Sequence, residues 1–589
     1  MSATQSDLSS AKYGYDFVVA TTQASINSGL KEYLAGANEP TTYLCFLADQ
    51  QGNPTQQISL DDLLTKTGGV NPFDIPAGTQ YDDPRITTLT QNMFVVGLQL
   101  KMGLPPGILP ADIPDVVDLG TSASAVTFNL FCSEFTVIQN SPPSGFGGAG
   151  SWNVWSQPSG AAWYFSTSCD LVTQDLANDL NTPYFTNHPD QKAAILAQMN
   201  NLSGSAFSLQ QLLFDLDNAA VQSIPTIEGL PAGSDAEVVL TKSFVDLYFQ
   251  TVKAYGQPVL SVHAVAQTPD NASLRLTALN REVNPYVDSN GSPVNDPSPQ
   301  QQSAVTLNLQ CAANNDPLPG SATFSWNWVD AASIDDEDGV VSVNRKTLAR
   351  WLYAQMLPTM QPACLTASTS VDAHWYGRVG NSWNFSENSP LPPTADSTAV
   401  QSSTTQVSVT LPDSGSEVLQ VSYANQADAS DSSGATSAEL DLHPSYTCTV
   451  TFSGQQITIT QRMWFWLKVR FDATSADGNV VDRSITDTLT LQVTENGELA
   501  VTAGEPVTAN NDQDIDLNWF VSLFVDMNDL IDNIKKWAVQ ITNATLTSIP
   551  SVDVQSFVFP GAQVFSYKDV VFSDTCDLTT AITYVAPSS

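Results

Sequence analysis

Long stretches of the chain alternate apolar and polar residues, and this period of two constrains the fold more than any other feature. The run TVTFSGQQITITQRMWFWLKVRFDA, around residues 449–473, is one example, and RSITDTLTLQVTENGELAVTAGEPVT, residues 483–508, is another. Successive side chains of a β-strand point to opposite faces, so the alternation predicts antiparallel strands with one buried face. We therefore expect the C-terminal third to be a long β-meander.

Turn sequences separate these runs. Glu495-Asn496-Gly497 predicts one turn, and Ala476-Asp477-Gly478-Asn479 predicts another. In the closing segment, residues 554–585, Pro560-Gly561 joins two alternating runs and predicts a β-hairpin. This hairpin follows directly on a helical segment, so we expect it to close a sheet over that helix.

The helical segment, residues 516–541, repeats its apolar residues at helical spacing. Acidic residues occupy its first turns and Lys535-Lys536 its last, as the helix dipole favours. Its apolar stripe is unusually wide, which predicts a helix buried on much of its circumference. The residues predicted to line a groove beside it are Trp519, Leu523, Met527, Leu530, Ile534 and Trp537.

The same spacing predicts three further helices, over residues 13–34, over residues 238–258, and from Ser342 or Asn344 to Met356. Helices near the start, the middle and the end, each continuing into strands, suggest two halves. We place them at 1–270 and 271–589. The expected fold class is α+β, mainly β, with long amphipathic helices beside antiparallel sheets.

The charge balance limits the classes of partner. Asp and Glu number 60 against 21 Lys and Arg, a net charge of −39, while charged residues form only 14% of the chain, below the roughly 25% of typical soluble proteins. Because nucleic-acid binding needs a basic patch and no Lys/Arg-rich run exists, that class is effectively excluded. The same charge repels anionic membrane surfaces.

Targeting signals are also missing from the pattern. The first 17 residues, MSATQSDLSSAKYGYDF, have neither the basic nor the apolar region of a secretory signal. No uncharged apolar run reaches the about 18 residues of a membrane span. We expect a soluble protein, either cytoplasmic or exported without a classical signal peptide.

Motifs for catalysis and metal binding are missing too. No GxSxG, HExxH, GxxxxGK[ST] or strand-linked GxGxxG motif occurs, and the four histidines are isolated in sequence: His188, His263, His374 and His443. The seven cysteines lie far apart without a CxxC pair, which is typical of reduced, buried thiols. We therefore expect no catalytic residues, no cofactor and no metal.

The acidic segment SIDDEDGVVSVNR is a candidate for a calcium loop. With Gly339 at the sixth loop position, the first and twelfth positions are Ile334 and Arg345, which cannot supply a carboxylate. The EF-hand hypothesis fails. A looser Ca²⁺ or Mg²⁺ site on Asp335, Asp336 and Asp338 stays open, but a solvated turn before the next helix is the expectation.

Two end motifs resemble a known family. Tyr13, Gly14, Tyr15 and Asp16 at the start, and FVFPGAQVFSYKDVVFSDTCDLTTAITY at the end, resemble the ends of the clostridial forty-seven-kilodalton toxin-cluster protein family. The matching positions of the second motif are Phe559, Pro560, Gly561, Asp577, Leu578, Ile582, Thr583 and Tyr584. The first motif departs from the family pattern, since Tyr15 replaces a Trp.

That family is similar to the tubular lipid-binding (TULIP) superfamily, in which a curved antiparallel sheet wraps a long helix. The resemblance implies non-enzymatic binding of a lipid or other hydrophobic ligand, and an accessory role in a toxin-like system. It implies no catalytic residues.

Two hypotheses remain open besides an enzyme with a scattered site, which has no named residue. The first is binding of an apolar ligand between helix and sheet, which needs mostly apolar lining and few polar groups. The second is a structural or protein-interaction protein whose helices fill their sheets and leave no ligand tunnel.

Overall fold

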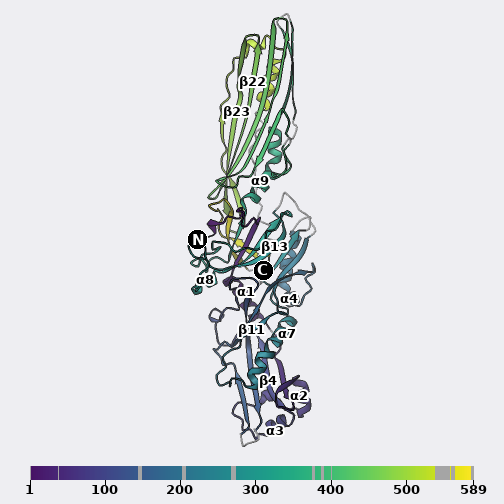
Figure 1. The fold of residues 1–589 in the computed structure, drawn as a ribbon, viewed down its shortest axis with the longest axis vertical. Coiled ribbons are helices and arrows are strands. Elements are labelled where there is room, and N and C mark those ends of the chain that lie inside the picture. Colours follow the sequence, from purple (N-terminus) through teal and green to yellow (C-terminus); the bar gives the residue numbers. More distant parts are fainter. Residues whose placement is uncertain are drawn as a thin grey trace.

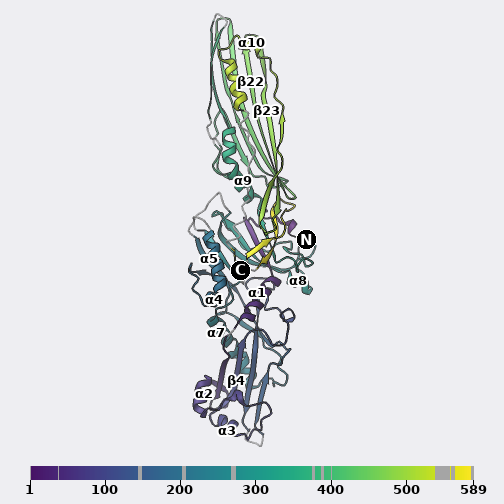
Figure 2. The ribbon, with the colours of Figure 1, turned by 180° about the vertical axis from the view of Figure 1, so that it is seen from behind.

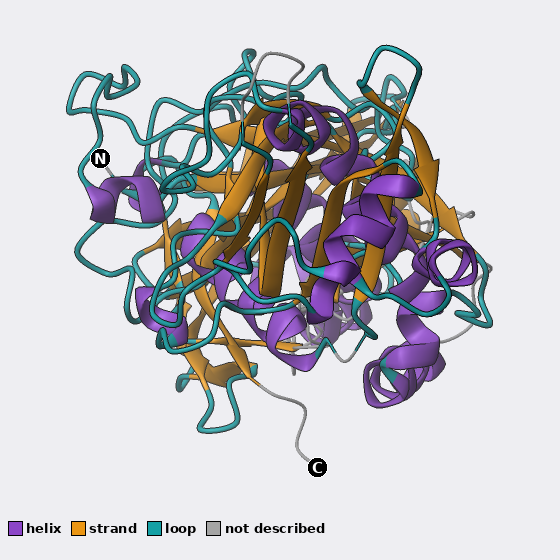
Figure 3. Cartoon of the chain, turned by 90° about the horizontal axis from the view of Figure 1, so that it is seen from below, coloured by secondary structure: helices purple, strands orange, loops and turns teal. Residues whose placement is uncertain are grey.

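The computed structural model describes residues 2–37, 39–143, 149–201, 207–266, 274–374, 378–386, 391–399, 401–537, 557–558 and 564–585. The chain is elongated, and its sheets follow one another along the long axis (Figure 1). The N-terminus lies near the middle of that axis rather than at either end, as the view from behind also shows (Figure 2). Figure 3, which looks along the axis, shows the strands at the centre and helices around them.

One end of the molecule is an eight-stranded antiparallel sheet in the order β18-β19-β21-β22-β23-β24, with β20 beside β21 and β25 beside β23. We call it the C-terminal sheet. The predicted long β-meander is confirmed. Its strands are β18 (Thr405–Thr410), β19 (Glu417–Asn425), β20 (Ala427–Ser433), β21 (Thr436–Ser453), β22 (Gln456–Phe471), β23 (Thr474–Val493), β24 (Leu499–Ala503) and β25 (Val507–Asn510).

Of the two turns predicted here, one is confirmed and one is wrong. The Gly497 N–H donates to the Thr494 carbonyl, which closes the turn before β24. Residues 476–479 instead belong to β23, which pairs with β22 from Thr474 onward. The chain reverses earlier, at Asp472, whose positive φ of 49° makes the tight turn.

Helices lie beside the C-terminal sheet (Figures 1 and 2). Helix α9 (Arg345–Met360) is longer than predicted, since it continues past Pro358. The single helix predicted over 516–541 is wrong: α10 (Asn518–Val521) and α11 (Met527–Trp537) are separated by a turn. Asp526 in that turn has a φ of 59°, which a continuous helix cannot accommodate. Residues 538–541 lie outside the described residues.

The middle of the molecule is a seven-stranded sheet in the order β13-β14-β1-β15-β29-β27, with β28 beside β29. We call it the central sheet. Its strands are β1 (Phe17–Thr22), β13 (Leu276–Asn284), β14 (Thr306–Ala313), β15 (Gly339–Val343), β27 (Val564–Tyr567), β28 (Val571–Phe572) and β29 (Leu578–Val585).

The helix predicted over 13–34 is therefore half wrong, because Phe17–Thr22 forms β1 and only Gln23–Gly36 is helical, as α1. The sheet is buried on both faces. Phe17 and Val19 pack into the main hydrophobic core, whereas Val18 and Ala20 pack into a second core beneath the N-terminal residues. Burial on both sides removes the alternation that would have marked a strand.

The closing segment does not form the predicted hairpin over 516–541. β26 (Phe557–Val558) pairs with β12 (Ser261–Ala266), while β27 pairs with β29 in the central sheet. The two runs thus join different sheets, and Pro560 and Gly561 lie outside the described residues. β29 pairs with β15 rather than covering α11.

The other end of the molecule is a sheet in the order β11-β8-β6-β4-β2-β3, with β5 and β7 beside β6. Its strands are β2 (Thr42–Ala48), β3 (Pro54–Ile58), β4 (Phe94–Met102), β5 (Val117–Asp118), β6 (Val126–Ser141), β7 (Ser151–Ser156), β8 (Tyr164–Cys169) and β11 (Ala220–Ser223). A four-stranded sheet, β26-β12-β10-β9, adds β9 (Leu171–Leu176) and β10 (Phe207–Phe214).

Helices complete this end. The helix predicted over 238–258 is confirmed, although it begins earlier: α6 (Asp235–Val239) runs through a π-helical turn into α7 (Val245–Tyr255), which ends at Gly256. The other α-helices are α2 (Leu60–Thr67) and α3 (Pro84–Gln91) at this end, and α4 (Pro183–Asn187), α5 (Pro189–Asn201) and α8 (Pro299–Ser303) nearer the middle of the long axis (Figures 1 and 2).

Candidate functional site

The concave face of the C-terminal sheet is an extended apolar surface. Alternate residues of β19, β21, β22 and β23 point to it, and β21, with 18 residues, spans about 60 Å at the usual rise per residue. Each of these side chains is exposed by 2% or less: Val421, Tyr423, Leu440, Leu442, Cys448, Val450, Ile459, Met463, Phe465, Leu467, Val469, Val481 and Leu489.

Three separate segments cover this concave face. Helix α9, with 16 residues, is about 24 Å long. The hairpin of β16 (Thr366–Ala373) and β17 (Val379–Ser386) places Phe385 against Phe465, with ring centroids 5.6 Å apart. The third cover is the segment α10–α11, joined to β17 by a parallel bridge between Val379 and Phe524. The concave face is therefore covered by three separate segments of the chain rather than by one large second sheet.

The six residues predicted to line a groove are placed differently from one another. Met527, Leu530 and Ile534 on α11 are buried, with exposures of 1% or less, and pack into the main core. Leu523 is half-buried against that core. Trp519 on α10 is 47% exposed and lies edge-on to Phe471. Trp537 ends α11, and its side chain lies outside the described residues. That these residues line a ligand groove stays a prediction.

A few polar groups lie on the concave face. The Tyr446 hydroxyl donates to Gln461 Oε1 at 2.7 Å, and burial raises its pKa well above 10.0. Burial also raises the pKa of the neighbouring Cys448 thiol to about 12. Asp487 lies opposite Ile459 on this face and is only 5% exposed. By the same register Arg483, opposite Met463, also belongs to this face. The face therefore carries uncharged polar groups, one buried carboxyl and one arginine.

The convex face of the same sheet has the opposite character. Arg462, Trp464, Trp466, Lys468 and Arg470 alternate on β22 with the buried residues. The cations are paired on this face: Arg462 Nε lies 2.8 Å from Asp482 Oδ1, and Lys468 and Arg470 contact Glu439. The period-two pattern of β22 thus separates an apolar face from a charged aromatic face.

Near the central sheet, an enclosed apolar cavity lies where α1 meets β14 and the start of β12. Its volume is only about 10 Å³, which is close to the volume one water probe occupies. This contact is too tight for a lipid. The lining residues are Thr21, Ile26, Leu260, Ser261, Leu307 and Leu309.

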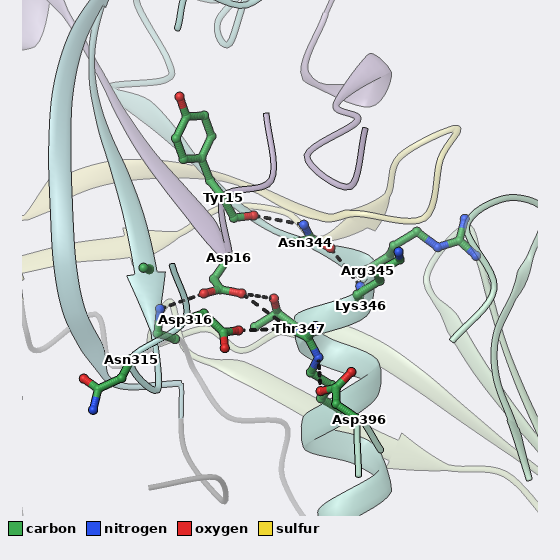
Figure 4. Close-up of polar contacts among 12 residues, drawn as sticks. Tyr15, Asp16, Asn315, Asp316, Asn344, Arg345, Lys346, Thr347 and Asp396 are labelled. Atoms are coloured by element: carbon green, nitrogen blue, oxygen red, sulfur yellow. Dashed lines mark hydrogen bonds and ion pairs between the residues drawn. The ribbon is translucent and has the colours of Figure 1, made fainter. Parts of the chain in front are cut away.

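The two end motifs meet at the start of α9. Asp16 accepts hydrogen bonds from the Ala313 N–H, at 2.8 Å, and from the Thr347 hydroxyl, as Figure 4 shows. Burial raises the pKa of its carboxyl to about 6, in spite of these donors. Arg350 on the next turn of α9 pairs with Asp316 at 3.0 Å and Asp396 at 2.7 Å.

Asp577 lies on the other side of the same helix start. Its carboxyl accepts from the Ser6 hydroxyl, the Leu8 N–H and the Arg345 N–H, at 2.8, 2.6 and 3.0 Å. Burial raises its pKa to about 7. Asn344 caps the helix by accepting from the Lys346 N–H at 2.8 Å. Asp16 and Asp577 therefore hold the first residues, the last strand and α9 together.

Sequence reasoning noted both aspartates as motif positions but missed their shared role. The available signal was the Asn344 cap, which marks a helix start whose free N–H groups attract carboxylates. Spacing alone could not reveal that both carboxyls bind the same helix start, because Asp16 and Asp577 are separated by almost the whole chain.

The remaining candidates for chemistry lie in separate places. His263 is fully buried, which lowers its pKa to about 3, and His443 pairs with Asp428 beside Trp466. His188 stacks on Tyr184, and His374 lies 3.5 Å from Asp372. All seven cysteines are buried and free. Within the described ranges, no three His, Cys, Asp or Glu side chains are grouped to hold a metal ion.

Comparison with known proteins assigns no family. No family model matches the chain, and no curated protein matches it. Among solved structures, a crystal structure of lipopolysaccharide binding protein aligns over 98% of this chain and 100% of that chain, with 10% sequence identity and a TM-score of 0.27. A TM-score of this size does not establish a shared fold. No helix in the part of the chain that the structure describes could span a membrane.

Proposed function

We propose that the protein is a non-enzymatic, TULIP-like binding protein that holds a lipid or other hydrophobic ligand against the concave face of the C-terminal sheet. One observation carries the proposal. A face about 60 Å long is lined mainly by apolar side chains and is covered by α9, by the segment α10–α11 and by a hairpin. The cover thus consists of three segments of the chain.

The end motifs support the finer assignment within this proposal. Their resemblance to the clostridial toxin-cluster family suggests an accessory role in a toxin-like system. The arrangement of amphipathic helices beside a curved sheet agrees with the TULIP plan. The polar groups expected of a ligand site are few, and Tyr446 and Gln461 supply two on the concave face.

A second candidate is a structural or protein-interaction protein with a filled core. The burial of Met527, Leu530 and Ile534 favours it, because side chains at 1% exposure already occupy part of the concave face. The two candidates differ in whether any apolar molecule is retained.

Native mass spectrometry of the full chain, together with organic extraction, tests the proposal. We expect a co-purifying lipid, or saturable binding of a fluorescent diacylglycerol. Leu467 points to the concave face, so Leu467→Trp adds side-chain volume there and should weaken that binding at least threefold. Trp466→Leu changes the neighbouring convex residue and should leave it unchanged. A protein that retains no apolar molecule and binds no probe belongs to the second candidate.

A further inference from the structure

Helix α11 is held on the concave face by apolar contacts. Met527, Leu530 and Ile534 are buried, whereas Asp529 and Asp532 on its other side are exposed. Within the described part of the chain, the hydrogen bonds of residues 527–537 run inside the segment, such as Leu530 N–H to the Asp526 carbonyl. Packing of one apolar stripe is therefore the main attachment of the helix.

The anchor of the segment lies before the helix. The Val379 N–H donates to the Leu523 carbonyl at 2.9 Å, and the Val525 N–H donates to the Val379 carbonyl at 3.2 Å. Asp526 follows at once with a φ of 59°. The segment is thus fixed to β17 at one point, and α11 begins immediately after a change of backbone direction.

An acyl chain can replace what α11 contributes to the concave face. The helix covers the sheet with three long apolar side chains. A lipid chain with about a dozen methylene groups buries at least as much apolar surface, and burial is roughly proportional to area. If α11 leaves the sheet, few of its backbone N–H and C=O groups lose a partner, because these groups are hydrogen-bonded within the helix.

The charges select the kind of lipid. Arg462, Lys468 and Arg470 of β22 lie on the convex face, away from the ligand position. Arg483, opposite Met463, is committed to Asp512 at 2.7 Å. Asp487 is buried on the same face. A phosphate there would meet a buried carboxyl group, and each cation of β22 and β23 already has an acidic partner, which is unfavourable in a weakly polar site.

We infer that α11 occupies the ligand position on the concave face, and that an uncharged lipid binds by displacing it. This inference rests on the proposed function. It deepens that function in two ways, by naming the ligand class and by identifying the part of the protein that moves.

The experiment compares two fluorescent probes with the same acyl chains, a diacylglycerol and the corresponding phosphatidic acid, on the full chain. We expect the diacylglycerol to bind saturably and phosphatidic acid at least tenfold more weakly. Hydrogen exchange of residues 527–537 should accelerate when the diacylglycerol binds. Equal affinity for both probes overturns the charge argument.

Matched variants test the displacement. Leu530→Ser weakens the packing of α11 on the concave face and should raise diacylglycerol affinity at least threefold. Asp529→Ser, on the exposed side of the helix, should leave that affinity unchanged. If the diacylglycerol binds with unchanged exchange in α11 and unchanged affinity in Leu530→Ser, displacement is wrong and the proposed function stands. If neither the natural chain nor Leu530→Ser binds any probe, the proposed function itself fails. The exchange measurement on the natural chain decides the matter should Leu530→Ser not fold.

Discussion

Asp16 and Asp577 show how single residues join distant parts of this chain. Each carboxyl is buried yet receives two or more hydrogen bonds, from segments that include the N-terminal residues, β14 and α9. Hydrogen bonds favour the ionised form, while burial disfavours it. Burial is the larger effect for both groups, because it raises both pKa values above the ordinary 3.8.

This shift predicts a pH dependence of stability. Asp577 keeps its proton up to about pH 7 in the fold, against 3.8 ordinarily, so the folded state binds more protons between these values. The contribution of Asp577 to the free energy of unfolding is therefore fully present below pH 3.8. Between pH 3.8 and about 7 this contribution falls by about 1.4 kcal/mol per pH unit. Urea unfolding from pH 4 to 8 measures it.

The variant Asp577→Asn, which cannot titrate, isolates the effect from the acidic surface. Its free energy of unfolding should change less between pH 4 and 7 than that of the natural chain. Asp574→Asn, at an exposed position, should keep the natural profile. Parallel profiles for the natural chain and Asp577→Asn would contradict the assignment.

At the scale of elements, turns connect the sheets as well as the strands within a sheet. The Gly497 turn before β24 touches the central sheet, because the Tyr567 N–H donates to the Gly497 carbonyl at 2.9 Å. Gly497 has a φ of 73°, and a Cβ at this position would collide with Ser566. The turn was predictable from Glu495-Asn496-Gly497, whereas its second contact was not.

Gly497 and Gly454 both have a positive φ, but only Gly497 lies against another side chain. Comparing them separates the cost of backbone strain from the cost of the close contact. Gly497→Ala should destabilise the protein by about 2–4 kcal/mol, since it combines left-handed strain with overpacking. Gly454→Ala, at a φ of 60° with nothing within 4 Å, should cost only about 1–2 kcal/mol. Thermal and urea unfolding measure both. A cost for Gly454→Ala as large as that for Gly497→Ala would mean that the Ser566 contact is unimportant.

At the scale of the whole molecule, the two predicted halves share one sheet. β1, from residues 1–270, lies between β14 and β15 from residues 271–589, and β26 pairs with β12 of the first half. The main hydrophobic core is likewise continuous from Phe17 to Ile582. A boundary near residue 270 therefore crosses backbone pairing in both directions.

Separate expression of 1–270 and 271–589 tests this interdependence. The first fragment would leave both edges of β1 unpaired, and the second would lack a central strand of its sheet. We expect neither fragment alone to unfold cooperatively, and the mixed fragments to form a complex on size-exclusion chromatography. Cooperative unfolding of either fragment by itself would show that the central sheet is not shared in this way.

The sequence by itself determined the local character of the elements. Alternation along 449–473 and 483–508 identified the long strands, because one face of each is buried and the other solvated. Helical spacing likewise identified α7, most of α9 and the apolar stripe of α11. The closely spaced turn residues added one correct reversal, at Gly497.

Only the tertiary structure decided the rest. The sequence of β1 resembles a helix because the strand is buried on both faces, and the break at Asp526 follows directly on the bridge between Phe524 and Val379. β26 pairs with β12, and β29 pairs with β15, across more than two hundred residues. The carboxyls of Asp16 and Asp577, from opposite ends of the chain, both bind the first residues of α9. Local patterns record which faces of an element are buried. They do not record which distant element buries them, because that choice depends on the packing of the whole chain.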